Sequence, residues 1–334
     1  MCLHSYNCLP TQALIFWWCS QGIHWKIIFY RSPIPNSMWS LLQIELYKIS
    51  KRSRTYIAFA AIAAIVFIFQ FAFKADGQSY MNLMLQNVND TFELDKSKAI
   101  NGYFMCYIIL NTLLIQVPIL VALVAGDTIS GEANMGTLRL MLTKPISRVQ
   151  ILMIKFLASV IYTILLLLWM AVIALFASLL IFGVNDMLIF RVSGDESQIL
   201  LISKDDVLWR YFAAFAYAAV ALTVIAALAL LLSVFAENSI GPIIATVCIV
   251  IVCTVISNIN VPIIDKYVKP YLFTSYLVGW KGFFYINTTE EGQPIKGSLE
   301  NWPAIRNSLI ILLVHIGVLL GIATIAFKRK DVLS

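Results

Sequence analysis

The sequence has little charge and lacks the short motifs that mark several classes of enzyme. Only 13% of its 334 residues are Asp, Glu, Lys or Arg, against about 25% in soluble domains, which excludes an ordinary soluble domain. No HExxH or GxSxG motif points to an intramembrane protease. No CxxC or Cys/His ligand spacing occurs, so neither a disulfide framework nor a metal site is expected. A GxxxxGKS or GxxxxGKT phosphate loop is also missing, so we expect no catalytic or cofactor site for ATP on this chain.

Long apolar runs are what the chain has in abundance. A helix needs roughly 20 apolar residues to cross a bilayer. Six runs have about this length, at residues 56–73, 103–124, 156–182, 211–235, 241–261 and 308–327. A β-barrel would instead show alternating segments of about 10 residues. We therefore predict an all-α membrane protein with six transmembrane helices, joined on the outer side by long polar loops at 74–102 and 184–210.

Basic residues indicate how these six spans are oriented. An even number of spans places both ends of the chain on one side, and Lys and Arg accumulate in short cytoplasmic segments. Seven basic residues flank the first and last runs: Lys48, Lys51, Arg52, Arg54, Lys328, Arg329 and Lys330. We expect an integral protein of the cell (inner) membrane with both termini cytoplasmic.

The character of the sequence changes at Met38. Residues 1–37 have no clear period, and they lack the basic start and small-residue cleavage site of a secretory signal. From Met38 on, five apolar residues share one helical face, as in a helix that lies in the membrane interface: Met38, Trp39, Leu42, Leu46 and Ile49. We expect 38–334 to be the membrane domain and Met38 to be the biological start. The alternative is a genuine hydrophobic extension that rests on the membrane.

Residues 126–148, called the elbow below, interrupt the apolar sequence between the second and third runs. The spacing after Gly136 predicts a short helix with Leu138, Met141 and Leu142 on its apolar face and Arg139 displaced from it. That helix should end before Pro145. Ser147 and Gln150 match a capping box for the next helix, and Ser130 is predicted to cap a turn that carries Glu132. The elbow is then either a docking element for another protein or an ordered connector.

The elbow resembles the cytoplasmic segment of permease subunits of type-2 ATP-binding cassette (ABC) exporters. The similarity rests on residues in a recurring order: Asp127, Gly131, Glu132, Gly136, Thr137, Leu138, Pro145 and Arg148, followed by Lys155. It extends over about residues 38–334, with a basic amphipathic entry (Glu45, Lys48, Arg52), an aromatic segment at 271–285 and a basic ending.

This resemblance implies a function shared between chains. Two permease copies or paralogues would form the pathway in the lipid bilayer, and two separate cytoplasmic ATPases would bind ATP and Mg²⁺. The elbow would be the ATPase-coupling interface, through Asp127, Ser130, Gly131, Glu132, Gly136, Thr137, Arg139, Pro145 and Arg148. Residues 271–285 would enter the outer leaflet and return as a re-entrant segment before the sixth span. No nucleic-acid partner is implied.

Polar residues inside the spans are candidates for the pathway. Asn111, Gln116 and Asn258 are prominent, and each could equally make a hydrogen bond between helices. The spans hold no deep Asp, Glu, Lys or Arg, which disfavours a proton-coupled carrier. The alternatives to the exporter are a non-transporting scaffold or accessory protein and, less favoured, an intramembrane enzyme.

Overall fold

A computed structural model describes residues 38–85, 100–143, 146–193, 196–287 and 295–330, so that residues 1–37 and Pro145 lie outside it. The described part of the chain is mostly helical. Within it, six helical segments are long and apolar enough to cross a membrane: Ser53–Gly77, Gly102–Asn134, Arg148–Phe182, Lys204–Phe235, Ile240–Asn258 and Trp302–Arg329. They contain or closely overlap the six predicted runs, which confirms the prediction of a mostly helical protein with six candidate spans.

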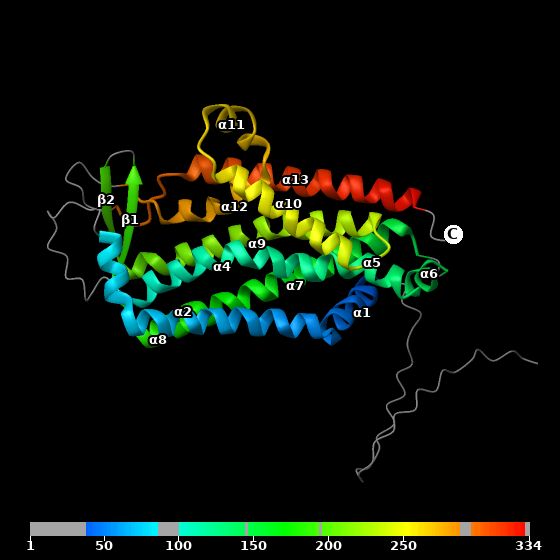
Figure 1. Cartoon of the computed structure of the whole chain (residues 1–334), viewed down its shortest axis with the longest axis horizontal. Helices are drawn as coiled ribbons and strands as arrows, with labels where there is room; N and C mark the ends of the chain where they lie inside the picture. Colours follow the sequence, from blue (N-terminus) through cyan, green and yellow to red (C-terminus); the bar gives the residue numbers. More distant parts are fainter. Residues whose placement is uncertain (1–37, 86–99, 144–145, 194–195, 288–294, 331–334) are drawn as a thin grey trace, which may run out of the picture. The chain divides into compact units, whose positions relative to one another are not determined.

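Figure 1 shows the helical elements that the structure describes. In chain order they are α1 (Met38–Lys51), α2 (Ser53–Leu85), α4 (Gly102–Ala125), α5 (Asp127–Asn134), α6 (Thr137–Leu142), α7 (Arg148–Val172), the π-helical turn η1 (Ile173–Ala177), α8 (Ser178–Phe182), α9 (Lys204–Phe235), α10 (Ile240–Asn258), α11 (Pro262–Tyr267), η2 (Lys269–Tyr271), α12 (Phe273–Leu277), η3 (Val278–Phe284) and α13 (Trp302–Arg329).

Helix α9 lies at the centre of this bundle. It packs against α4, α7, α10 and α13, and 72% of its most apolar window is buried, against 11% for α13. Small residues on α9, among them Ala214, Ala218 and Ala221, are buried and let the neighbouring backbones approach closely. Helices α7, α10 and α13 bury much smaller shares of their apolar windows, at 28, 17 and 11%, whereas α4 buries 50%.

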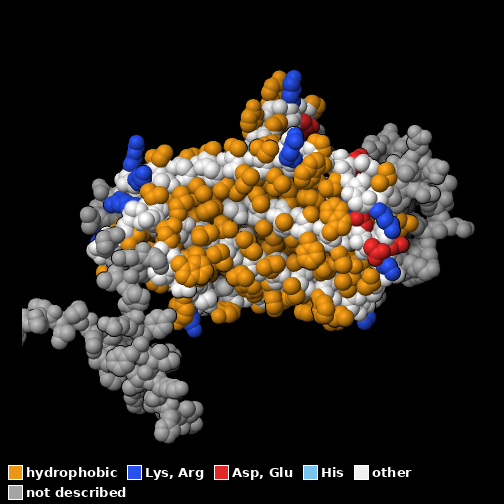
Figure 2. Space-filling model, turned by 180° about the vertical axis from the view of Figure 1, so that it is seen from behind, with side chains coloured by type: hydrophobic (Ala, Val, Ile, Leu, Met, Phe, Trp, Pro, Cys, Tyr) orange, Lys and Arg blue, Asp and Glu red, His pale blue; other side chains and the backbone are white. Residues whose placement is uncertain are grey.

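The outer surface has the distribution expected of a protein surrounded by lipid. Figure 2 shows hydrophobic side chains over the middle of one face, while the Lys, Arg, Asp and Glu side chains gather toward its two ends and on a projecting segment. Large exposed side chains include Ile68 and Phe71 on α2, Leu168 on α7 and Leu313 on α13. A contiguous apolar surface of this kind is unusual for a soluble monomer and fits a multi-pass membrane protein.

Helix starts follow local sequence signals. Ser147 accepts a hydrogen bond from the Gln150 N–H at 3.2 Å, and the Gln150 side chain accepts one from the Ser147 N–H at 3.2 Å, which confirms the predicted capping box. Asn101 caps α4 in a similar way through the Phe104 N–H, at 3.0 Å. The third span therefore begins at Arg148, eight residues before the predicted apolar run.

A β-hairpin departs from the all-α prediction. Strands β1 (Met187–Ser193) and β2 (Glu196–Ile202) pair antiparallel, with Met187 opposite Ile202. Met187, Ile189 and Ile202 are buried in the main hydrophobic core, so the hairpin covers the end of the bundle. The prediction of a polar loop at 184–210 was therefore wrong, because the apolar residues where the hairpin meets the bundle, Met187 to Ile189 and Ile202, are buried.

Three short helical turns precede the sixth span. η2, α12 and η3 replace a continuous helix over residues 269–284, and Trp280, Phe283 and Phe284 of η3 are buried. The rings of Trp280 and Phe284 lie 5.4 and 5.3 Å from the ring of Tyr107 on α4, measured between centroids. The aromatic segment is thus packed against the bundle.

Candidate functional site

Four charged side chains from three helices form a closed cycle of ion pairs beside the elbow. These residues, called the ion cluster below, are Glu45 and Lys48 on α1, Glu132 on α5 and Lys155 on α7. Lys48 Nζ lies 2.8 Å from an oxygen of Glu45 and 2.8 Å from an oxygen of Glu132. Lys155 Nζ lies 3.0 and 2.7 Å from the second oxygens of the same two carboxylates. Each carboxylate therefore bridges both lysines.

The ion cluster is largely removed from solvent. Glu45, Glu132 and Lys155 are buried, and only Lys48 is partly exposed. Lys155 also donates to the carbonyl oxygen of Thr128 at 3.1 Å, and the Lys48 ammonium lies 3.8 Å from the Met141 sulfur on α6. Burying charges is unfavourable unless they are paired, so this cluster fixes the relative positions of its helices more than it adds net stability.

Asp127 organises a second group of charges at the start of α5. Its carboxylate pairs with the guanidinium group of Arg52, and Arg54 lies 3.3 Å from its other oxygen. A Cβ at Gly131 would lie 2.4 Å from Asp127 Oδ1, so the carboxylate occupies space that any other residue at 131 would fill. Gly131 is therefore required by close approach rather than by backbone conformation.

Ser130 lies inside α5, so the prediction that it caps a helical turn was wrong. Helix α5 begins directly after Gly126, whose backbone is helical, and the Ser130 hydroxyl donates to the Gly126 carbonyl at 2.8 Å. Ser233 on α9 takes the capping role instead. Its oxygen accepts the N–H groups of Ile129 at 3.2 Å and of Ser130 at 2.9 Å, which satisfies donors of the first turn of α5.

The predicted helix of the elbow is present as α6, but its apolar face points inward. Leu138 is fully buried in a second hydrophobic cluster with residues of α7, α9 and α13, and Met141 and Leu142 pack against that cluster. This face therefore packs within the chain and is not free to contact another protein. The apolar side chains that remain outside are Met135 (62% exposed) and Leu140 (69% exposed), next to the exposed Arg139 and Thr137.

Gly136 and Arg148 set the two ends of this arrangement. Gly136 has φ of 70°, a left-handed conformation that breaks the helix between α5 and α6 and that glycine adopts without penalty. Arg148 donates to the carbonyl oxygens of Phe327, Lys328 and Lys330, the last at 2.6 Å. A cation at these carbonyls is favourable because it caps the C-terminal end of α13.

Two of the three predicted pathway residues meet at a polar cavity. Asn111 and Asn258 line a cavity of about 390 Å³ between α4, α10 and the turns before the sixth span, together with Lys269 and Lys281. Asn258 donates to the Thr254 carbonyl of its own helix at 2.8 Å. Gln116 is exposed on the outside of α4 and does not line this cavity.

The main partners of Glu132 were not identified from the sequence as part of one site. Glu45, Lys48 and Lys155 lie at least 23 positions away from Glu132 in the sequence, so no local pattern joins them. One signal was present, namely a Glu and a Lys three residues apart on an otherwise apolar helical face. Within the described ranges no group of His, Cys, Asp or Glu is arranged to hold a metal ion.

Raising the pH should weaken the ion cluster through Lys48. Burial acts to lower the pKa of this ammonium, but the carboxylates of Glu132 and Glu45 outweigh burial and hold the pKa above its ordinary value of 10.5. A lysine whose pKa is higher in the folded than in the unfolded state stabilises the fold fully at pH values below its unfolded-state pKa. That stability is lost as the pH rises through its folded-state pKa. Above pH 10.5 the unfolding temperature of the wild type should therefore fall faster than that of Lys48→Met; parallel curves would contradict this.

Comparison with known protein families places most of the chain in one family. A family model described as a protein of unknown function (DUF2705) matches residues 61–333, which includes the whole elbow and five complete candidate spans. No curated protein matches the chain.

Proposed function

The chain belongs to the DUF2705 family, and we propose that it is the permease subunit of an ATP-driven exporter, coupled through the elbow to a separate cytoplasmic ATPase. In this proposal the membrane domain at 38–334 pairs with a second permease copy or paralogue. ATP and Mg²⁺ bind the ATPase, and both termini of this chain are cytoplasmic. In the same proposal helix α1 lies in the membrane interface and residues 271–285 enter the outer leaflet and return.

One observation carries the proposal: α5 and α6 are tied firmly to the bundle on one side and expose apolar side chains on the other. Glu132 connects α5 to α1 and α7 through the ion cluster, and Ser233 connects it to α9. Met135 and Leu140 stay outside, at the same end of the molecule as the basic entry of α2. A partner that binds this edge would therefore act on several spans at once.

The predicted coupling residues differ in burial, and the proposal gives them different roles. Thr137, Arg139 and Gly136 are exposed and would contact the ATPase, whereas Asp127, Ser130, Gly131 and Glu132 are buried and would transmit its movement. Coupling further requires that the edge bind the two conformations of the ATPase with different free energies, because equal binding shifts nothing.

A co-purification experiment tests the proposal. The full chain is co-expressed with ATPases encoded near it and purified in detergent, as wild type, Leu140→Glu and the control Leu201→Glu, which makes the same change at an exposed position in the hairpin. Burial of one leucine contributes about 1.5–3 kcal/mol, so Leu140→Glu should lower ATPase retention by at least about tenfold. The control should retain as much ATPase as the wild type.

Two results would count against the proposal. If Leu140→Glu and Leu201→Glu retain equal amounts of ATPase, the partner does not bind at α6. If the wild type retains no ATPase at all, a non-transporting scaffold becomes the better description of the chain.

A further inference from the structure

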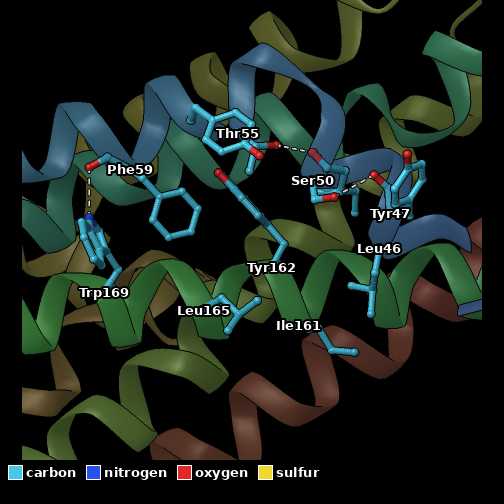
Figure 3. A pocket seen from close by; sticks show the side chains of 11 residues that line it. Leu46, Tyr47, Ser50, Thr55, Phe59, Ile161, Tyr162, Leu165 and Trp169 are labelled. Atoms are coloured by element: carbon cyan, nitrogen blue, oxygen red, sulfur yellow. Dashed lines mark hydrogen bonds between the residues drawn. The ribbon is translucent and has the colours of Figure 1, made fainter. Parts of the chain in front are cut away.

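An apolar groove lies between α1, α2 and α7, on the side of α1 away from the ion cluster. Its volume is about 730 Å³, within the range of about 300–1,000 Å³ that small-molecule sites have. Figure 3 shows Leu46 on α1, Phe59 on α2 and Leu165 and Trp169 on α7 around it. Its walls are formed by α1, which precedes the first span, and by the spans α2 and α7. Lipid can therefore enter the groove from the side.

Three polar side chains on the groove wall, of which only Thr55 is buried, are already hydrogen-bonded within the chain. The Thr55 hydroxyl donates to the Ile49 carbonyl at 2.6 Å, and Ser50 donates to the Tyr47 carbonyl at 2.9 Å. The Trp169 indole N–H donates to the Phe59 carbonyl at 3.1 Å (Figure 3). None of these groups needs a ligand.

Tyr162 is the exception. Its side chain rises from α7 into the space between α7 and α2, edge-on to the Phe59 ring, and the residue is 3% exposed. Its hydroxyl has no hydrogen-bond partner among the described residues. A buried hydroxyl without a partner is unfavourable, and the hydrocarbon around a membrane protein supplies no water to satisfy it. The groove therefore offers one hydrogen-bond donor to an otherwise apolar occupant.

A cation lies over the ring of one residue of the groove wall, although it does not itself line the groove. The Lys51 ammonium lies 5.5 Å from the centroid of the Tyr47 ring, and Tyr47 lines the groove. No carboxylate of the described chain forms an ion pair with Lys51, in contrast to its neighbours Lys48, Arg52 and Arg54. An ammonium in this position attracts an anion at the membrane surface.

We infer that the groove binds one anionic glycerophospholipid. One acyl chain lies along Phe59, Leu165 and Trp169. An ester carbonyl accepts a hydrogen bond from the Tyr162 hydroxyl, and the phosphate is near Lys51. This inference does not rest on the proposed transport function. It has a structural consequence, because α1 presents Leu46 and Tyr47 to the groove and Glu45 and Lys48 to the ion cluster, so the lipid supports the helix that completes that cluster.

Native mass spectrometry of the full chain in detergent tests this site. The chain is titrated with phosphatidylglycerol, with phosphatidylcholine of the same acyl chains, and with inorganic phosphate. We expect one retained phosphatidylglycerol per chain. Tyr162→Phe should weaken binding of both lipids about fivefold, as loss of one hydrogen bond does. Lys51→Gln should weaken only phosphatidylglycerol, also about fivefold. Leu165→Trp, which fills the groove, should abolish retention of either lipid.

The chain offers matched controls for these variants. Lys266 lies over the ring of Tyr267 at 5.3 Å, which repeats the Lys51 and Tyr47 arrangement away from the groove. Lys266→Gln and Tyr267→Phe should therefore bind both lipids as the wild type does. Wild-type affinity in Tyr162→Phe or Leu165→Trp would overturn the inference. The inference would also be overturned if inorganic phosphate bound with the same dependence on Lys51. A second copy of the chain retained in place of lipid would overturn it as well.

Discussion

Replacing Lys155 with methionine is expected to lower the free energy of unfolding by about 3–5 kcal/mol, the range found when one partner of a buried ion pair is removed. Lys155 pairs with both Glu45 and Glu132 and donates to the Thr128 carbonyl. Without it two buried carboxylates share only Lys48, and one of them must become protonated or reach water. The change is measured by denaturant unfolding of the purified chain in detergent.

Two further variants separate the charge effect from loss of packing. Lys48→Met removes the partly exposed lysine and should cost less than Lys155→Met. The double variant Lys155→Met/Glu132→Leu leaves Glu45 paired with Lys48, so it should regain a large part of the loss. The comparison is with the single variants Lys155→Met and Glu132→Leu. If the double variant loses as much stability as these two together, Lys155 acts through packing and the electrostatic argument fails.

Replacing Arg210 with methionine should have an effect of similar size, about 3–5 kcal/mol, at the other end of the bundle. This fully buried guanidinium pairs with Asp206 at 2.6 Å and donates to the carbonyl oxygens of Phe283 at 2.7 Å and Ser298 at 2.9 Å. It thereby connects α9 to η3 and to the turn before α13. Its loss leaves the two carbonyls without this donor and the Asp206 carboxylate with only the Trp209 and Gly297 N–H groups, so η3 should also show faster hydrogen exchange.

Two control variants for Arg210→Met test the geometry of the guanidinium group and the burial of the ion pair. Arg210→Lys keeps the charge but lacks the planar fork that reaches three acceptors, so it should restore only part of the stability. Lys269→Met breaks an exposed pair with Asp265 and should cost less than about 1 kcal/mol. An equal loss in Arg210→Met and Lys269→Met would show that burial does not govern these pairs.

The parts of the fold that could be predicted are those determined by local sequence. The six apolar runs are long, and the capping box of Ser147 and Gln150 is complete within four residues, so both were identified correctly. The hairpin had a signal as well, since two apolar segments flank the Gly-Asp pair at 194–195, a dipeptide typical of tight turns. That signal was outweighed by the surrounding polar residues.

The site could be predicted only in part because its contacts cross the sequence. Glu132 was identified through its place in the elbow, but its partners come from α1 and α7. Ser130 was assigned as a cap because serine favours that position, whereas a serine from α9 supplied the contact. Leu138 faces inward because the ends of α7, α9 and α13 provide a surface for it, which local periodicity does not reveal.

The ion cluster also limits how the helices can move. The two carboxylates and two ammonium groups have a net charge of zero. Helices α1, α5 and α7 can therefore rotate or translate together as a rigid body with little change in electrostatic energy. A slide of α5 along α7 by one residue, about 1.5 Å of axial rise, would instead stretch two short ion pairs at once. The permitted displacements are thus concerted ones, and relative sliding of the three helices meets an electrostatic barrier.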